Sequence, residues 1–353
     1  MSAIPDDFDD LEERIRQRIN SRTKPLGSLG KLEDIAARIA LMQNSLNPQL
    51  SKPAMLVFAA DHGIAASSVS PYPQDVTWQM VMNFLSGGAA INVFCKQHDI
   101  DFKIIDAGVN YRFPPDVILG ADQGIRLIDR KIAYGTRNFL LEPAMSGGER
   151  ERALNIGAEL AAQEYTAGCN IIAMGDMGIG NSTSAAMLMS EFCGIDVENC
   201  VGRGAGLDDA GVRHKKEILK QHVSARASAP RGALEILARY GGFEIAMICG
   251  AMIEAARKKM IILVDGFIAT AANIAAAELS QNVRAHSIYT HRSGEQGHAE
   301  MLRYLGAEAI LDIGMRLGEG SGAAVAYPII QSAVLFFNEM AGFDTAGVSV
   351  SSL

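Results

Sequence analysis

One carboxylate stands among glycines near the C-terminus, in the sequence MRLGEGSGA at residues 315–323. Glycines permit positive φ and let a ligand approach the backbone closely. A helix start also offers free N–H groups to an anion. We expect a buried strand over residues 310–315, a tight loop and then a helix. In such a loop Glu319 is either a general acid/base or a hydrogen-bond acceptor that orders the loop, and the motif alone leaves both interpretations open.

Two more glycine-rich stretches occur earlier, GDMGIG at 175–180 and GRGAGL at 202–207. Neither has the spacing of a dinucleotide fingerprint, and the P-loop pattern is absent. Glycine clusters of this kind are often simple tight turns. However, the first precedes a Ser/Thr-rich helix start and the second lies near Lys215, and together they favour a phosphate site. Lys215 by itself is also typical of a solvated helix residue.

Several acidic residues end apolar runs of strand length: Asp61, Asp106, Asp176 and Asp265. For each of them, a hydrogen bond to the following turn is the simple alternative to a functional role. His62 and His291 are expected to orient loops rather than to bind a metal. Because no HExxH or CxxC pattern occurs, we expect no metal ion and no cofactor.

Apolar runs of strand length alternate with helical segments along the chain. We expect strands at 54–60, 102–105, 170–174, 260–264, 287–289 and 310–315. We expect one helix over 75–95 and an irregular excursion over 111–130. This alternation predicts a parallel α/β sheet with right-handed crossovers. The polar loops follow the strands, so they should gather at the carboxyl edge of the sheet, where such folds bind ligands.

The two ends of the chain are predicted to be helical. Two helices precede the first strand, and the last helix could return to pack on them after Pro328, which we expect to kink that helix or to begin a new one. We therefore expect a small helical domain from residues 1–50 with about 329–353. Residues 51–328 would form the large α/β catalytic domain.

The composition of the 353-residue chain indicates a compact globular protein, with 48% apolar and 20% charged residues. Its net charge of −8 argues against broad contact with nucleic acid or anionic membranes. The five cysteines are an odd number without CxxC, which favours free thiols in a reducing compartment over disulfides. No signal peptide and no membrane span are expected, and the cytoplasm is the expected location.

Motifs spread over nearly the whole chain resemble those of one family, the nicotinate-nucleotide–dimethylbenzimidazole phosphoribosyltransferases of cobalamin biosynthesis. The motifs are KPLGSLGKL (24–32), ADHG (60–63), 201–207, GGF (241–243), DGF (265–267) and above all MRLGEGSGA (315–323). The resemblance implies a homodimer. It also implies that each subunit has a large Rossmann-like domain and a small domain of N- and C-terminal helices.

The resemblance implies a specific reaction between two small molecules. The 5-phosphoribosyl group moves from nicotinate mononucleotide to 5,6-dimethylbenzimidazole, with inversion from β to α, and the products are α-ribazole 5′-phosphate and nicotinate. No metal is needed, because the nicotinate ring of the donor is already a positively charged leaving group. What the protein supplies is a positioned base, alignment and electrostatics.

The resemblance also assigns roles to individual residues. Glu319 matches the catalytic base that takes the imidazole proton. Asp176 matches an acidic site residue that is Glu in a relative. The positions that match contacts around the nucleotide and its phosphate are Gly178, Gly202, Gly204, Lys215 and Ser293.

The acceptor pocket departs from the family pattern. Where a relative has Ser and Gln, this chain has Tyr72 and Met80. We expect the segment from Tyr72 to Met80 to form the acceptor pocket together with Leu317. Another benzimidazole or a purine is an alternative acceptor. The alternative functions are a nicotinate-nucleotide hydrolase, a glycosyltransferase with a different base, and a non-catalytic nucleotide sensor.

Overall fold

The computed structural model describes residues 7–119, 125–226 and 228–349. These residues divide into two compact units, Met1–Ser51 with Ala326–Leu353 and Lys52–Val325. We propose that the two units correspond to the small helical domain and the large catalytic domain, respectively.

The larger unit contains one parallel sheet in the order β3-β2-β1-β4-β5-β6. The strands are β1 Ala54–Ala60, β2 Asp101–Gly108, β3 Leu127–Asp129, β4 Ile171–Met177, β5 Ile261–Val264 and β6 Ser287–Tyr289. Every residue of β1 is buried, as the uninterrupted apolar run predicts for a central strand covered on both faces. The strand order reverses between β1 and β4, and this switch point is where such sheets bind ligands. The Rossmann-like α/β fold predicted from the sequence is therefore confirmed.

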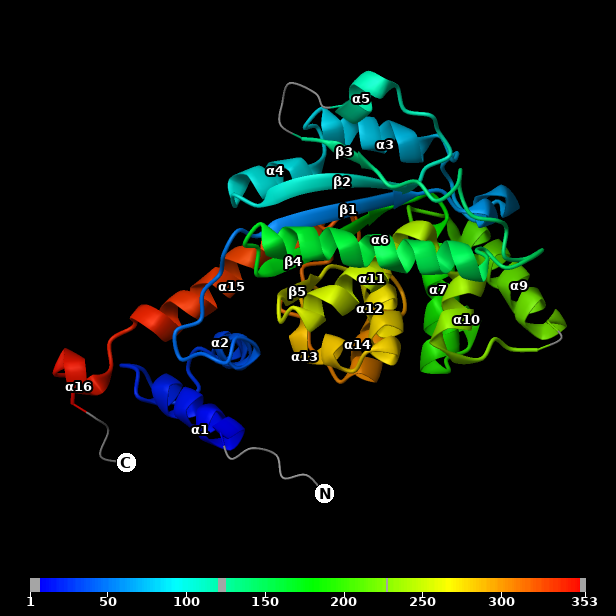
Figure 1. Cartoon of the computed structure of the whole chain (residues 1–353). Coiled ribbons are helices and arrows are strands. Elements are labelled where there is room, and N and C mark those ends of the chain that lie inside the picture. Colours follow the sequence, from blue (N-terminus) through cyan, green and yellow to red (C-terminus); the bar gives the residue numbers. More distant parts are fainter. Residues whose placement is uncertain (1–6, 120–124, 227, 350–353) are drawn as a thin grey trace. The chain divides into compact units, whose positions relative to one another are not determined.

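Helices cover both faces of this sheet, with α3 and α4 on one side and α6, α11 and α12 on the other (Figure 1). The helices of this unit, with the short 3-10 helix η1, are η1 Gly63–Ser67, α3 Val76–Leu85, α4 Ala90–Gln97, α5 Pro115–Leu119, α6 Gly147–Thr166, α7 Asn181–Cys193, α8 Val197–Cys200, α9 Asp209–Ala225, α10 Gly232–Tyr240, α11 Phe243–Arg257, α12 Phe267–Leu279, α13 Asn282–His286 and α14 His298–Leu305. Helix α15, Ser321–Glu339, begins in this unit and continues into the other.

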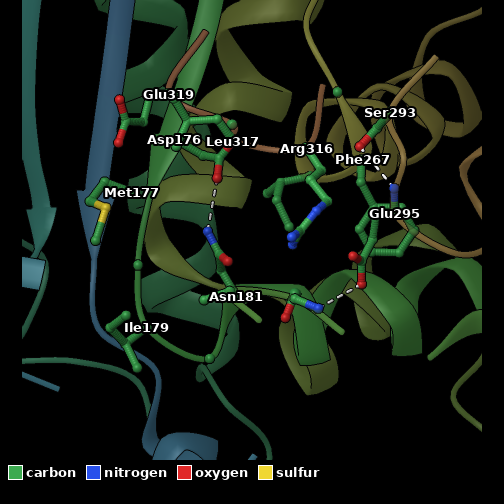
Figure 2. Close-up of a pocket in the computed structure, with 18 of the residues that line it drawn as sticks. Asp176, Met177, Ile179, Asn181, Phe267, Ser293, Glu295, Arg316, Leu317 and Glu319 are labelled. Atoms are coloured by element: carbon green, nitrogen blue, oxygen red, sulfur yellow. Dashed lines mark hydrogen bonds between the residues drawn. The ribbon is translucent and has the colours of Figure 1, made fainter. Parts of the chain in front are cut away.

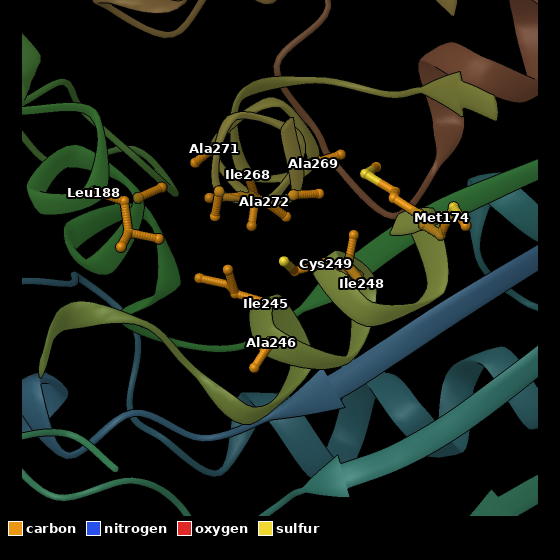
Figure 3. Close-up of a cluster of buried hydrophobic side chains, with 14 of the residues drawn as sticks. Met174, Leu188, Ile245, Ala246, Ile248, Cys249, Ile268, Ala269, Ala271 and Ala272 are labelled. Atoms are coloured by element: carbon orange, nitrogen blue, oxygen red, sulfur yellow. The ribbon is translucent and has the colours of Figure 1, made fainter. Parts of the chain in front are cut away.

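The core on the α11 side is a cluster of buried apolar side chains. Figure 3 shows Leu188 of α7, Ile248 of α11 and Ile268 of α12 in one cluster that also includes Met174 of β4. Small residues bring the helices together: a Cβ added at Gly157 of α6 would lie 1.9 Å from the carbonyl oxygen of Met247 on α11. The high glycine and alanine content thus reflects close helix packing.

The smaller unit consists of α1 Asp7–Asn20, α2 Lys31–Met42, α16 Phe343–Ala346 and the C-terminal part of α15. Arg18 of α1 donates a hydrogen bond from Nε to the carbonyl oxygen of Phe337 at 3.1 Å. Arg22 donates to the carbonyl oxygens of Phe337 and Met340. Helix α15 therefore does return to the N-terminal segment, and these arginines satisfy carbonyl groups at its C-terminal end.

Helix α15 is also long and apolar enough to cross a membrane when judged by length and composition alone. Its apolar window is 56% buried inside the structure, as is common for a core helix. Pro328 lies within this helix and does not begin a new one.

Two of the predicted elements are wrong. Residues 310–315 form no strand but only an isolated bridge, Leu311 to His291, because Gly314 has φ +76° and Asp312 pairs with Arg292 at the surface. The sixth strand is instead β3, in the segment expected to be irregular. The helix predicted over 75–95 is two helices, α3 and α4, separated where Gly87 takes φ +76°.

The crossing of α6 and α11 generates a stability prediction. Gly157→Ala should destabilise the protein by about 1–3 kcal/mol, because the added methyl group forces the two helices apart. This loss should exceed the roughly 1 kcal/mol that alanine gains in helix propensity. Urea unfolding measures the difference.

Gly148→Ala is the matched control in the same helix, because a Cβ there meets nothing within 4 Å. This variant should be neutral or slightly more stable than the wild type. If the two variants have equal stability, close packing at Gly157 is not the constraint.

Candidate active site

A pocket opens at the carboxyl ends of β4, β5 and β6, as the sequence predicts for the ligand site. Its wall comes from segments far apart in the chain: residues 69–70, 176–182, 204–205 and 266–268, then His291, Ser293 and Glu295, and finally 316–319. All of these segments belong to the larger unit. Within the described part of the chain, no group of three or more His, Cys, Asp or Glu side chains is placed to hold a metal ion.

Glu319 lines the pocket from an unusual backbone conformation. Gly318, Glu319 and Gly320 have φ values of +82°, +63° and +81°, so a non-glycine residue is held in the left-handed region. A Cβ added at Gly175 of β4 would lie 2.5 Å from the carbonyl carbon of Glu319. The loop can therefore reach the sheet only because residue 175 is glycine.

Asp265 anchors this loop by hydrogen bonds. Its Oδ2 accepts a hydrogen bond from the N–H of Gly320 at 3.1 Å, and its Oδ1 accepts one from Ala323 at 3.0 Å. Asp265 is 1% exposed. Its carboxylate thus satisfies N–H groups at the start of α15, where a negative charge is favourable. The hydrogen-bonding role considered for this residue in the sequence is real, but the partners lie far away in the chain.

The burial of these carboxylates shifts their protonation. Burial, and then the charge of Asp265, raise the pKa of Glu319 from 4.5 to about 7. Burial, and then the charges of Asp265, Glu244 and Glu319, raise the pKa of Asp176 well above its usual range, although a hydrogen bond from Asn181 opposes this. A carboxylate with a pKa near 7 is matched to proton transfer at neutral pH.

The other end of the pocket gathers polar groups near the start of α7, among them the side chains of Asn181, Ser293 and Glu295 (Figure 2). Asn181 donates from Nδ2 to Oδ1 of Asp176 at 2.9 Å. The N–H of Gly204 donates to Oε1 of Glu295 at 2.9 Å. Behind this wall the fully buried Lys215 donates from Nζ to Oγ of Ser182 at 3.1 Å, and burial lowers the pKa of its ammonium group to about 8.

The structure brings most of the predicted site residues together. The predicted residues that line the pocket are Asp176, Gly178, Gly204, Ser293, Leu317 and Glu319. Gly202 and Lys215 lie behind the wall: a Cβ at Gly202 would be 2.2 Å from Oε1 of Glu295, and Lys215 touches Ser182. Tyr72 and Met80 are absent from the described lining, and the side chain of Tyr72 is 51% exposed.

Comparisons with known proteins cover almost the full chain. Residues 4–348 match the phosphoribosyltransferase family model. A nicotinate-nucleotide–dimethylbenzimidazole phosphoribosyltransferase of Ralstonia nicotianae is 52% identical over 339 residues, 96% of this chain and 94% of the relative. The chain belongs to this phosphoribosyltransferase family. The resemblance predicted from the motifs is confirmed.

Other members of the family give the same result. A relative of the same name from Dechloromonas aromatica is 48% identical, with 98% of this chain and 97% of the relative covered. The crystal structure of CobT from Thermus thermophilus matches with a TM-score of 0.90 at 39% identity, over 97% of this chain and 100% of that chain.

Several residues of this pocket were not predicted from the sequence. Asn181, Glu295 and Arg316 contribute polar side chains to the pocket. Glu295 lies in the polar stretch THRSGE that follows β6, and Asn181 lies at the start of α7. A polar residue shortly after a strand was therefore a usable signal of a pocket residue. The sequence did not show which of these side chains point into the pocket.

The raised pKa of Glu319 predicts a pH-dependent cost in stability. In the folded chain Glu319 keeps its proton up to about pH 7, whereas an unfolded chain releases it near its ordinary value. The folded state therefore binds more protons in this window and loses stability as the pH rises through it. The shift corresponds to about 3 kcal/mol.

Glu319→Gln removes this cost. Relative to the wild type, the variant should gain about 2–3 kcal/mol of unfolding free energy between pH 5 and pH 8. Urea unfolding of both proteins at the two pH values measures the gain. A difference that does not change with pH would contradict the assigned titration.

Proposed function

We propose that this protein transfers the 5-phosphoribosyl group of nicotinate mononucleotide to 5,6-dimethylbenzimidazole or a related base. The products are nicotinate and α-ribazole 5′-phosphate, and the step belongs to cobalamin biosynthesis. The observation that carries the chemistry is Glu319, a buried carboxylate that lines the pocket with a pKa near 7. Membership in the phosphoribosyltransferase family supports the same reaction.

The reaction balances with one base and no added reagent. One ring nitrogen of the benzimidazole attacks C1′ of the ribose from the face opposite to nicotinate. The bond from C1′ to the pyridinium nitrogen breaks, and its electron pair neutralises that nitrogen. Glu319 accepts the proton from the second ring nitrogen of the acceptor. The configuration at C1′ changes from β to α because attack and departure occur on opposite faces.

Asp176 is proposed to face the ribose. It is 6% exposed, lines the pocket and is held by Asn181. In its protonated form this carboxyl group can donate to a ribose hydroxyl, and in its ionised form it can stabilise the positive charge that develops at C1′. Burial, which raises the pKa of Asp176, favours the first role.

The 5′-phosphate is proposed to bind at the start of α7. Ser182 and Gly204 line the pocket there, with Lys215 directly behind Ser182. Backbone N–H groups at a helix start and a nearby ammonium group form a typical phosphate site. Gly178, Gly202 and Ser293 would complete the surroundings of the nucleotide.

The acceptor is proposed to lie beside Leu317, whose side chain is 55% exposed on the pocket wall. Tyr72 and Met80 remain proposed acceptor contacts. Val69 and Ser70, which precede them in the same connection, line the pocket. A homodimer and a cytoplasmic location also remain proposals, and all five cysteines are free.

Incubation with nicotinate mononucleotide and a panel of benzimidazoles and purines, read by mass spectrometry, tests the function. The wild type should form the α-ribotide and release nicotinate only when a base is present. Release without any base would indicate a hydrolase, and binding without release would indicate a sensor. Neither alternative is favoured.

Glu319→Gln should lower kcat roughly 10²–10⁴-fold, because Gln keeps the shape but cannot accept a proton. The kcat/KM of the wild type should also fall below about pH 7, where Glu319 becomes protonated. Near-normal turnover in a folded variant would remove Glu319 from this role.

Lys215→Ala should raise the KM for nicotinate mononucleotide far more than the KM for its dephosphorylated riboside. In the wild type, the KM for the mononucleotide should also rise above about pH 8, where the Lys215 ammonium group loses its proton. Steady-state kinetics with both donors between pH 6 and 9 measure this. Equal losses with both donors would place the phosphate elsewhere.

A further inference from the structure

Three buried side chains form a hydrogen-bonded chain that the proposed chemistry does not use. Nδ1 of His62 lies 2.9 Å from Oγ of Ser184. Nε2 of the same ring lies 2.5 Å from Oε1 of Glu244. All three residues have no exposed surface. They come from separate elements: the loop after β1, α7 and α11.

The combination of serine, histidine and carboxylate does not form a nucleophilic triad here. Ser184 is fully buried inside the first turn of α7, so no substrate can reach its hydroxyl group. None of the three side chains lines the pocket. An effect on the reaction must therefore pass through other residues.

The pair of His62 and Glu244 is costly to bury. The second carboxylate oxygen of Glu244, Oε2, is buried and has no hydrogen-bond partner among the described residues. Replacing such buried polar pairs by apolar residues is often neutral or stabilising. Stability alone is thus a poor reason for this arrangement.

His62 packs directly against the turn that forms the pocket floor. A Cβ at Gly180 would lie 3.1 Å from Cβ of His62, and a Cβ at Gly178 would lie 3.4 Å from its ring. Both glycines line the pocket. The next two residues carry the polar contacts of the donor end, since Asn181 binds Asp176 and Ser182 binds Lys215.

We propose that His62 and Glu244 are positioning residues that fix the turn 178–184 for the ribose phosphate donor. Glu244 orients the imidazole ring, His62 holds Ser184, and Ser184 fixes the start of α7. Asn181 and Ser182 then keep their distances to Asp176 and Lys215. The predicted effect on the donor rests on the proposed function, whereas the effect on the turn does not.

Glu244→Gln and Ser184→Ala test this proposal. The matched control is Glu164→Gln, because Glu164 is 7% exposed, accepts from Lys103 at 2.6 Å and lies outside the pocket. Each protein is examined by donor and acceptor kinetics. Amide hydrogen exchange of residues 178–184 is measured without any ligand.

We expect both test variants to raise the donor KM by between about 10- and 100-fold, with the acceptor KM unchanged. Exchange in the turn should accelerate in the test variants and not in the control. The pH dependence that arises from Glu319 should stay in place. A purely structural role would instead lower the stability of the two test variants and leave the donor KM unchanged.

Folded test variants with normal donor KM and normal exchange would overturn the proposal. If Glu244→Gln does not fold, Ser184→Ala decides by the same two measurements. If the wild type transfers no phosphoribosyl group, the proposed function fails. Accelerated exchange in the turn would still support the positioning pair in that case, and unchanged exchange would overturn it.

Discussion

The position of Glu319 depends on the buried carboxylate of Asp265. Because Asp265 binds the N–H groups of Gly320 and Ala323, it fixes the backbone on the C-terminal side of Glu319, in a conformation that a non-glycine residue disfavours. Asp265 directly follows β5. It can reach the loop only because β5 pairs directly with β4. Gly175 of β4 then lets the loop come into contact with the sheet. Strand order, one glycine and one carboxylate therefore act together to place the candidate base.

The same anchor also affects the protonation of Glu319, the proposed base. Burial raises the pKa of both Glu319 and Asp265. For Asp265 the rise is opposed by His291 and by backbone N–H groups of residues 320–323. The rise for Glu319 is reinforced by the negative charge of Asp265. The hydrogen bonds to Asp265 and the nearby His291 thus favour the ionised form of Asp265, whereas the negative charge of Asp265 favours the protonated form of Glu319.

Much of this organisation could be predicted from the sequence, because it depends on local signals. The apolar run 54–60 required a central strand, and polar residues after strands had to meet at one edge of a parallel sheet. The pairing of Asp265 with Gly320 could not be predicted, since it joins residues 55 apart in the chain. The three residues of β3 carry too little pattern to predict an edge strand. Lys215 appeared typical of a solvated helix residue because its burial depends on the packing of α9 against other elements.

Three helices, α7, α12 and α15, begin at or next to the pocket, and a buried acid already occupies N–H groups at the start of one of them. At α15 the N–H groups of Gly320 and Ala323 are already occupied by Asp265, so the positive end of that helix is neutralised from inside the protein. At α7 the buried acid acts at a distance, because Glu244 reaches Ser184 only through His62. The proposed phosphate site lies at the start of α7, where Lys215 adds its charge behind Ser182. The proposed base and the proposed phosphate site therefore lie at the starts of two different helices, and only the start of α15 has its N–H groups bound by Asp265.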